Sequence, residues 1–307
     1  MVLRCYSMTT ILITGGSGLV GSHLTKLLLG EGFAVRHLSR SAKPDAPVPT
    51  FEWNIAKGFI DPRALENVDH IIHLSGVGIA DERWTEERMR VLYSSRVDAA
   101  ALLHREMGMA GAWPKSFISA SGINYYGTHT SDQVFNEEDP PANDTLGKLC
   151  QSWEGAANDW AAQCRVVTLR TSVVLAREGG ALSKLAGPAR WGLASPLGHG
   201  RQWMPWVHID DLARAYLHVI RNAEMHGAYN IAAPEDVRNR EMMREVAHAL
   251  HHPYLFPAVP RFVLRAMLGE LSSMVLEGSR VSNAKLVASG FEFRHPELKE
   301  ALKGLLQ

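Results

Sequence analysis

A glycine-rich loop near the N-terminus is the first group of residues whose types and spacing could do chemistry. It reads Thr14-Gly15-Gly16-Ser17-Gly18-Leu19-Val20-Gly21. In such a loop Gly15 permits a tight turn, Gly18 lets the backbone approach a pyrophosphate, and Gly21 lets the next helix pack closely. A β-branched run precedes the loop and a segment of helical periodicity follows it, so free N–H groups at the helix start would face the phosphates. We predict a dinucleotide site built from the loop residues Gly15, Gly16, Ser17, Gly18, Leu19, Val20 and Gly21.

The residues after the second apolar run indicate which dinucleotide the loop would hold. The run Phe33–Leu38 is predicted to be a strand, and Ser39-Arg40-Ser41 follows it, with Lys43 close by. An NAD site usually carries Asp or Glu at this point, where the carboxylate accepts a hydrogen bond from the ribose 2′-OH. Arg40 would instead pair with a 2′-phosphate, although a solvated loop arginine is the alternative. We therefore predict NADP(H) as the cofactor.

Strand-like and helix-like segments alternate along the chain and would position these residues. Strands are predicted at 10–14, 33–38, 68–74, 116–120, 165–170 and 228–231, with a further strand-like piece at 290–294. Helices are predicted at 18–30, 85–107, 148–163, 210–222 and 239–250, and Thr85 would cap the second of them. This alternation predicts an α/β fold, a Rossmann-like doubly wound parallel sheet with a smaller C-terminal α/β lobe. We place the NADP-binding domain at 9–175, with returning segments to about 235, and the lobe at about 176–205 and 236–307.

Composition argues against several kinds of partner. The chain has 307 residues and a formal net charge of zero without a long basic run, so we expect neither nucleic acid nor a membrane as a partner. Cys5, Cys150 and Cys164 form no CxxC pair, and the 14 histidines show no HExxH spacing. We therefore expect no metal and a reduced, cytoplasmic setting, with no signal peptide at the N-terminus. The expected partner is an unknown small-molecule substrate, and the expected state is a monomer or homodimer.

Several motifs together resemble a known group of proteins. The glycine loop, the His73-Leu74-Ser75-Gly76 turn, and Ile118–Ser121 followed by Tyr125-Tyr126-Gly127 look like the extended short-chain dehydrogenase/reductases. Further segments resemble one branch, the "epimerase family" proteins with a small C-terminal domain of unknown function: Arg83-Trp84-Thr85, Ser95-Arg96, Leu149–Glu154, Trp206–Asp211 and Leu276–Val281. The resemblance runs from about residue 9 to the end of the chain.

This resemblance implies a fold and a set of cofactor contacts. The fold would be a seven-stranded Rossmann-like core with an added C-terminal lobe. The cofactor would meet Ser39 and Arg40 at the adenosine phosphate, Leu74, Ser75 and Gly76 along the cleft, and Arg96 and Val173 further on. Spacing alone would make Arg96 a surface charge on a helix and Val173 a core residue.

The residues that the family uses for chemistry are missing from their expected positions. Its reductases use Tyr-x-x-x-Lys, in which the Tyr is the general acid/base and the Lys lowers its pKa. With Glu154 at the place of the family's Glu, counting back puts Cys150 at the Lys position and Leu146 at the Tyr position. Leucine has no titratable proton, and cysteine provides no cation, so neither side chain can do the usual work.

Other side chains could act as substitutes. Ser121 sits where the superfamily places a Ser or Thr that contacts the substrate hydroxyl, and Tyr126 is the nearest phenol, so we nominate both as catalytic residues. Loop packing is the alternative for Tyr126 and its neighbour Tyr125. His208 and Asp210 could face the cleft, or His208 could cap the following helix.

Two functions from different classes fit these residues. The first is an NADP(H)-dependent, epimerase-like oxidoreductase that acts on a small organic substrate, with Ser121, Tyr126 or a bound water transferring the proton. The second is a non-catalytic NADP(H)-binding sensor or partner-binding protein, which the missing Tyr and Lys favour. Strict sugar-nucleotide epimerisation is disfavoured because it needs the missing Tyr base. Trp191, Trp203 and Trp206 predict an aromatic cleft for a planar or sugar-like ligand, or else packing under a long loop.

Overall fold

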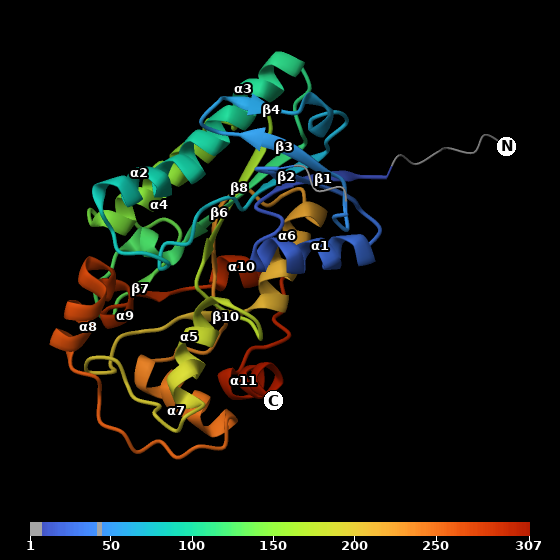
Figure 1. The fold of residues 1–307 in the computed structure, drawn as a ribbon. Coiled ribbons are helices and arrows are strands. Elements are labelled where there is room, and N and C mark those ends of the chain that lie inside the picture. Colours follow the sequence, from blue (N-terminus) through green and yellow to red (C-terminus); the bar gives the residue numbers. More distant parts are fainter. Residues whose placement is uncertain (1–7, 42–44) are drawn as a thin grey trace.

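An eight-stranded sheet forms the centre of the protein, which a computed structural model describes over residues 8–41 and 45–307 (Figure 1). Cys5 and Lys43 lie outside the described residues. The strand order is β11-β8-β6-β5-β1-β2-β3-β4. Strand bounds are β1 Thr10–Thr14, β2 Ala34–Ser39, β3 Thr50–Asn54, β4 Phe59–Ile60, β5 His70–His73, β6 Ser116–Gly122, β8 Arg165–Thr171 and β11 Gly227–Ile231. Seven strands run parallel, which confirms the α/β prediction, and the short β4 pairs antiparallel with β3. The sheet therefore has one edge strand, β4, in addition to the seven strands that the resemblance implied.

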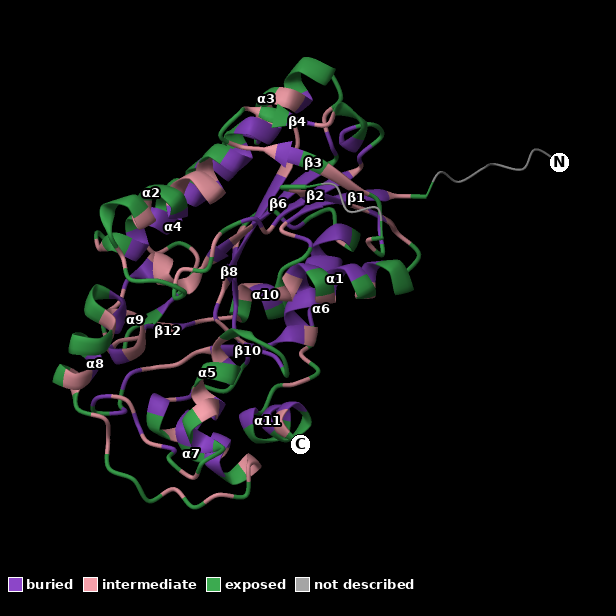
Figure 2. Cartoon of the chain, in the orientation of Figure 1, coloured by how far each residue is buried: buried purple, intermediate pink, exposed green. Residues whose placement is uncertain are grey.

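Helices cover both faces of this sheet. Along β1, Ile11 and Ile13 pack on one side with α1 (Leu19–Gly30) and α6 (Ile209–Arg221). Leu12 packs on the other side with α3 (Ala99–Ala110) and α4 (Thr145–Asn158). Alternate residues of a strand point to opposite faces, so a strand buried on both faces is apolar throughout. Figure 2 shows the strands buried between helices whose outer surfaces are exposed.

A π-helical turn divides the single helix that was predicted over 85–107. Thr85 caps α2 (Glu86–Tyr93), because its side chain accepts a hydrogen bond from the backbone N of Arg88, as predicted. The π turn follows at Ser94–Asp98, and α3 continues after it. Such turns often occur at functional sites, and this one brings the backbone of residues 95 and 96 against the end of β5.

A second apolar cluster lies beyond the sheet, at the end of the molecule that contains the C-terminus (Figure 1). It is formed by α5 (Gly180–Ala189), α7 (Asn239–Ala249) and α11 (Leu298–Leu306), with the two-stranded β9 (Val173–Leu175) and β10 (Trp206–His208). The remaining α-helices and strands are α8 (Arg261–Leu268), α9 (Ser273–Leu276), α10 (Ala284–Ala288), and β12 (Arg280–Val281) paired with β7 (Val134–Phe135). The domain boundaries stay a prediction, although Leu286 and Phe291, from the predicted lobe, pack in the cluster of the sheet.

The prediction of a strand at 290–294 is wrong. Side chains of α6, and not a neighbouring strand, make the hydrogen bonds to the backbone of this segment. Asp211 accepts hydrogen bonds from the backbone N of Arg294 and of His295, at 2.9 and 2.8 Å. Arg214 donates to the backbone O of Glu292 at 2.8 Å. Phe291 is buried, so the apolar alternation reflects packing against a helix and not strand pairing.

The helices of the described residues are short. The longest is α4, with 14 residues. Within residues 8–41 and 45–307, no helix has the length and apolar character needed to cross a membrane.

Candidate functional site

The glycine loop turns sharply between β1 and α1. Gly15 has φ +71°, and a Cβ built on it would lie 2.8 Å from the backbone of Leu74. The N–H of Gly18 donates to the O of Gly15 at 3.0 Å, and α1 begins at Leu19 without an acidic side chain in its first turn. The first N–H groups of a helix have no partner within the helix, so those of Leu19, Val20 and Gly21 stay available to an anion.

A cleft of about 430 Å³ opens beside this loop, at the carboxyl ends of β1, β2 and β5. Eight residues predicted to bind the cofactor line it: Gly15, Ser17, Gly18, Ser39, Arg40, Leu74, Ser75 and Gly76. Trp53 and Ile55 also line it, and no motif in the sequence singled them out. Ser95 lines it too, and it belongs to the Ser95-Arg96 segment of the resemblance, which placed only Arg96 at the cofactor. Gly16 lies instead against the imidazole of His37, which leaves no room there for a Cβ.

Arg40 stands at the mouth of the cleft. Its side chain is exposed, and no carboxylate pairs with it among the described residues. A guanidinium without a counter-ion suits a phosphate, which it can hold through two parallel hydrogen bonds.

A chain of buried hydrogen bonds fixes the turn after β5. The backbone N–H of Ser75 donates to Oγ1 of Thr14 at 3.1 Å, and that hydroxyl lies 3.0 Å from Nδ1 of His73. Nε2 of His73 lies 3.0 Å from the backbone O of Arg96. A carbonyl only accepts, so Nε2 carries the proton and Nδ1 accepts from Thr14. Burial lowers the pKa of His73 to about 4, which keeps the ring neutral.

Arg96 lies behind the wall of the cleft. Its guanidinium donates to the backbone O of Leu92 and of Val77, and it stacks on Trp153 at 4.8 Å from the ring centroid. A Cβ on Gly76 would meet this guanidinium at 2.9 Å. Arg96 therefore supports the backbone of Gly76 and Val77, which do line the cleft.

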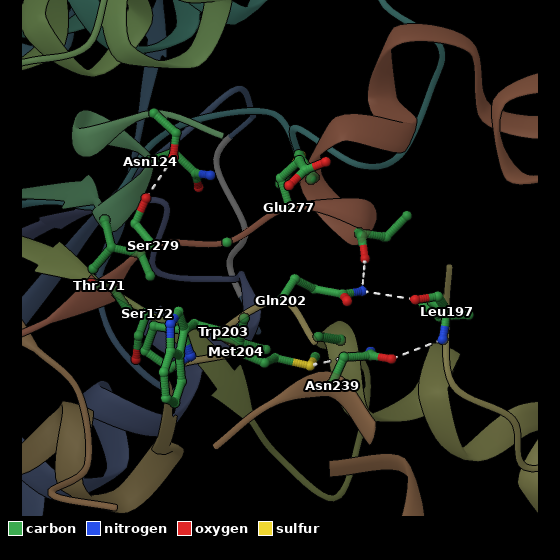
Figure 3. Close-up of a pocket in the computed structure, with 18 of the residues that line it drawn as sticks. Asn124, Thr171, Ser172, Leu197, Gln202, Trp203, Met204, Asn239, Glu277 and Ser279 are labelled. Atoms are coloured by element: carbon green, nitrogen blue, oxygen red, sulfur yellow. Dashed lines mark hydrogen bonds between the residues drawn. The ribbon is translucent and has the colours of Figure 1, made fainter. Parts of the chain in front are cut away.

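A second cavity, of about 270 Å³, lies at the carboxyl ends of β6 and β8 (Figure 3). Val173, predicted to meet the cofactor, lines it together with Asn124, Thr171 and Ser172. The other side comes from the C-terminal half of the chain, including Gln202. The cavity therefore shares the carboxyl edge of the sheet with the cleft, the edge where open α/β sheets bind ligands.

The tryptophans make only part of the predicted aromatic cleft. Trp203 lines the cavity, and its Nε1 donates to the backbone O of Ser131. Trp206 is fully buried in the C-terminal cluster, and Trp191 is 83% exposed. The prediction of a cleft is therefore wrong for these two: Trp191 faces solvent, and Trp206 packs in a core, which is closer to the packing alternative.

Ser121 and Tyr126 belong to one buried hydrogen-bond network. Glu154 accepts from Oγ of Ser121 at 2.8 Å and pairs with Arg170 through two bonds of 2.8 Å. The hydroxyl of Tyr126 accepts from Arg170 and donates to Asn230. Burial raises the pKa of Tyr126 to about 12. Neither predicted catalytic residue lines the cavity, so their part in proton transfer stays a prediction.

Cys150 and Leu146 lie on the buried side of α4. Leu146 packs in an apolar cluster with Leu92 and Leu149. Cys150 is buried close to Gly122, and its burial raises the pKa of the thiol to about 12. The thiol is therefore neutral at physiological pH and supplies no thiolate nucleophile.

His208 caps α6. Its Nδ1 accepts the backbone N–H of Asp210 at 3.1 Å, which is the second of the two roles considered for it. The Asp210 carboxylate pairs with His23 at 2.6 Å, and the rings of His208 and His295 stack at 3.7 Å. Nitrogen and oxygen atoms of His208, Asp210 and His295 lie within 4.8 Å of one another, as in some metal sites. The capping bond occupies the Nδ1 lone pair, however, so that atom cannot also coordinate a metal.

Fold and site together define a dinucleotide-binding α/β protein of the extended short-chain type. The chain belongs to the NAD-dependent epimerase/dehydratase family, whose model matches residues 11–232. A domain of unknown function, DUF1731, matches residues 259–305. Both matches agree with the resemblance drawn from the motifs, including its C-terminal part.

Similar proteins come from distant organisms. Epimerase family protein SDR39U1 of Mus musculus is 33% identical over 300 residues, which cover 96% of this chain and 99% of the mouse protein. The chloroplastic homologue of Arabidopsis thaliana is 32% identical over 98% of this chain and 88% of its own length. A crystal structure of human SDR39U1 with NADPH superposes with a TM-score of 0.85 at 31% identity, covering 97% of this chain and 99% of the human one.

Proposed function

We propose that this protein is an NADP(H)-dependent oxidoreductase that acts on a small organic substrate without the usual Tyr-x-x-x-Lys pair. The observation that carries the proposal is the cleft beside the glycine loop. The N–H groups at the start of α1, and Arg40, which pairs with no carboxylate in the part of the chain that the structure describes, would fit a dinucleotide with a 2′-phosphate. The human relative crystallised with NADPH supports the same cofactor.

The residues present fit this cofactor at each part of the cleft. A Cβ on Gly15 would meet the backbone of Leu74, and a Cβ on Gly76 would meet the guanidinium of Arg96, so glycine at both positions lets the segments that line the cleft pack closely together. Leu74 and Ser75 would hold the middle of the cofactor, and Val173 would lie toward the nicotinamide. When bound, NADPH supplies a hydride to a substrate carbonyl carbon and becomes NADP⁺, while the carbonyl oxygen gains a proton and becomes a hydroxyl.

The cavity at the ends of β6 and β8 would hold the substrate. It is enclosed mainly by apolar side chains with a few polar groups, which is typical of small-molecule sites. Ser121, Tyr126 or a bound water would transfer the proton. The hydroxyls of Ser121 and Tyr126 are already hydrogen-bonded to Glu154 and Arg170. A water in the cavity could donate the proton without breaking these hydrogen bonds.

A non-catalytic NADP(H)-binding sensor is the second candidate. Leu146 and Cys150 favour it, because neither side chain can supply the acid or the cation of the usual mechanism.

We also propose that the protein is located in the cytoplasm, which fractionation of cells would test.

Titration of the purified protein with NADPH, followed by a panel of carbonyl compounds, tests the proposal. We expect micromolar binding of NADPH and loss of NADPH absorbance with at least one compound. Binding without any turnover would favour the sensor, and no binding would contradict both functions.

A further inference from the structure

Two segments near the C-terminal cluster lie side by side and expose large apolar side chains. One follows α5 and the other follows α7. A Cβ on Gly192 would lie 3.7 Å from Nδ1 of His252, and further along the N–H of Gly198 donates to the backbone O of Val259 at 2.9 Å. The exposed apolar residues on these segments, which we call the apolar patch, are Trp191 (83% exposed), Leu193 (48%), Leu255 (79%) and Phe256 (47%).

The apolar patch lies at the end of the molecule farthest from the first strands of the sheet. The segment between α7 and α8 forms the lower edge of the protein in Figure 1, and Figure 2 shows that most of this segment is exposed. Single exposed apolar residues are common on protein surfaces, whereas a group of them on adjacent segments marks an interaction surface.

The charges along the same part of the chain are of one sign. The protein has 32 Asp and Glu among 307 residues, about one in ten, yet none of them lies at 179–209 or at 246–269. These two stretches contain five lysines and arginines. The expectation that no membrane is bound rests on a net charge of zero for the whole chain, and this charge is not evenly distributed.

Three arginines border the apolar patch. Arg190 directly precedes Trp191, and its exposed side chain pairs with no carboxylate among the described residues. Burial raises the pKa of Tyr254, and the positive charges of Arg240 and Arg244 oppose this rise. Both guanidinium groups therefore lie close to the segment that follows α7.

The two carboxylates of α7 already have partners. Glu245 pairs with Arg244 at 3.1 Å, and Glu241 accepts from a backbone N–H at the start of its own helix, at 2.7 Å. In the part of the chain that the structure describes, Arg240 donates to a backbone carbonyl at 3.4 Å and pairs with no carboxylate. Arg240 and Arg190 therefore remain available to an external anion.

A bilayer surface with anionic lipids fits these features better than a second copy of this chain. Tryptophan is favoured at the membrane interface, and arginines near the surface are attracted by anionic headgroups. In a symmetric dimer the patch of one copy would face the same patch of the other, so the arginines would meet like charges.

We propose that the apolar patch and the arginines around it bind the surface of an anionic lipid bilayer, with Trp191 and Leu255 inserted among the headgroups. None of these residues lines the cofactor cleft, so the inference does not depend on the proposed reaction.

Co-sedimentation of the full chain with lipid vesicles tests this inference. Vesicles of phosphatidylcholine alone are compared with vesicles that also contain phosphatidylglycerol, at low and at high salt. We expect the partition coefficient to be at least about tenfold higher for the anionic vesicles, because each free arginine near the surface contributes about fivefold. High salt should weaken the binding, because it screens the charges.

Two variants test the assignment to this surface. Trp191→Ala should lower the partition coefficient at least about fivefold, since it removes the largest apolar side chain of the patch. Arg190→Glu should lower it about tenfold, and only for the anionic vesicles. Both side chains are exposed, so the free energy of unfolding and the affinity for NADPH should not change. The matched controls are Met109→Ala on α3 and Arg90→Glu on α2, exposed positions outside the patch that should leave vesicle binding unchanged.

Several results would overturn the proposal. These are no binding to anionic vesicles, equal binding to both kinds of vesicle, or no effect of either variant. A dimer in sedimentation equilibrium that Trp191→Ala dissociates would assign the patch to an interface between two copies. Binding of soluble polyglutamate that Arg190→Glu weakens, without binding to vesicles, would assign it to an acidic protein.

Discussion

At the scale of single residues, Arg40 is the side chain that we expect to set the choice of cofactor. It is exposed at the mouth of the cleft and has no carboxylate partner among the described residues. Arg40→Ala removes the cation that would bind the 2′-phosphate, so we expect NADPH binding to weaken by about 1–3 kcal/mol, the value for a charge-assisted hydrogen bond. NADH has no 2′-phosphate, and its affinity should change little. Fluorescence titration with both nucleotides measures the difference.

The control for this variant is Arg190→Ala, which removes an exposed arginine after α5, away from the cleft. It should leave both affinities as they are. Equal weakening of NADPH and NADH by Arg40→Ala would rule out the role at the 2′-phosphate.

Tyr126 allows a structural role to be separated from a catalytic one. Tyr126→Phe leaves a buried nitrogen of Arg170 and the Oδ1 of Asn230 without their shared hydroxyl, so we expect the free energy of unfolding to fall by about 1–3 kcal/mol. The affinity of Tyr126→Phe for NADPH should stay within about twofold of that of the parent protein, because the hydroxyl does not line the cleft. Urea denaturation and titration provide the two values.

Tyr93→Phe is the matched control, since the hydroxyl of Tyr93 makes no hydrogen bond among the residues that the structure describes. Unchanged stability of Tyr126→Phe would contradict the structural role. A large loss of turnover at unchanged stability would establish the catalytic one.

At the scale of elements, Thr14 joins β1 to the turn after β5. Thr14→Val keeps the shape of the side chain but removes the acceptor of the Ser75 N–H and leaves Nδ1 of His73 with only the hydroxyl of Ser75, at 3.5 Å. We expect a loss of about 1–3 kcal/mol in unfolding free energy and weaker NADPH binding, because the turn it holds lines the cleft. Thr10→Val, on the same strand, should cost less, since its hydroxyl reaches only a carbonyl at 3.5 Å. Equal losses in the two variants would argue against this role of Thr14.

The elements that the sequence could predict are those determined by local rules. The glycine loop lies between a strand and a helix, and each of its positions follows from a short spacing. Parallel strands buried on both faces are apolar runs, so their existence and approximate ends are visible in the sequence. Thr85 could be identified as a cap because a capping side chain bonds only to its own helix.

The parts that could not be predicted depend on contacts between distant segments. Trp53, Ile55 and Ser95 reach the cleft only through the pairing of β3 and through the π turn. Gln202 donates a hydrogen bond to the backbone O of Val275 in the wall of the cavity, and no local pattern links residues so far apart in the chain. Residues 290–294 alternate like a strand, yet Asp211 on α6 satisfies their backbone. Sequence periodicity indicates which face of a segment is buried, but it does not indicate which residues pack against that face.

At the scale of the whole molecule, neutral histidines are distributed through the core. His73 is fully buried at the centre of the sheet, His70 lies at the start of the same strand, and His208 caps α6. Burial is the main cause that lowers the pKa of each to about 4, and the neighbouring His295 adds to the shift at His208. All three rings remain neutral in the folded protein at pH values where an unfolded chain would protonate them.

The fold should therefore begin to lose stability at pH values above those at which carboxylates titrate. In the unfolded chain these histidines protonate near pH 6.5, whereas in the folded protein they do so near pH 4, so the stability is present above pH 6.5 and is lost as the pH falls toward 4. For His73 alone, the free energy of unfolding should fall by about 1 kcal/mol between about pH 7.5 and about pH 5.5. His70 and His208 add to this slope. Urea denaturation across that range measures it, and His73→Asn, which cannot titrate, should show a shallower slope than the parent protein. A parent stability that stays flat or rises toward pH 5.5 would mean that these rings are protonated in the folded state.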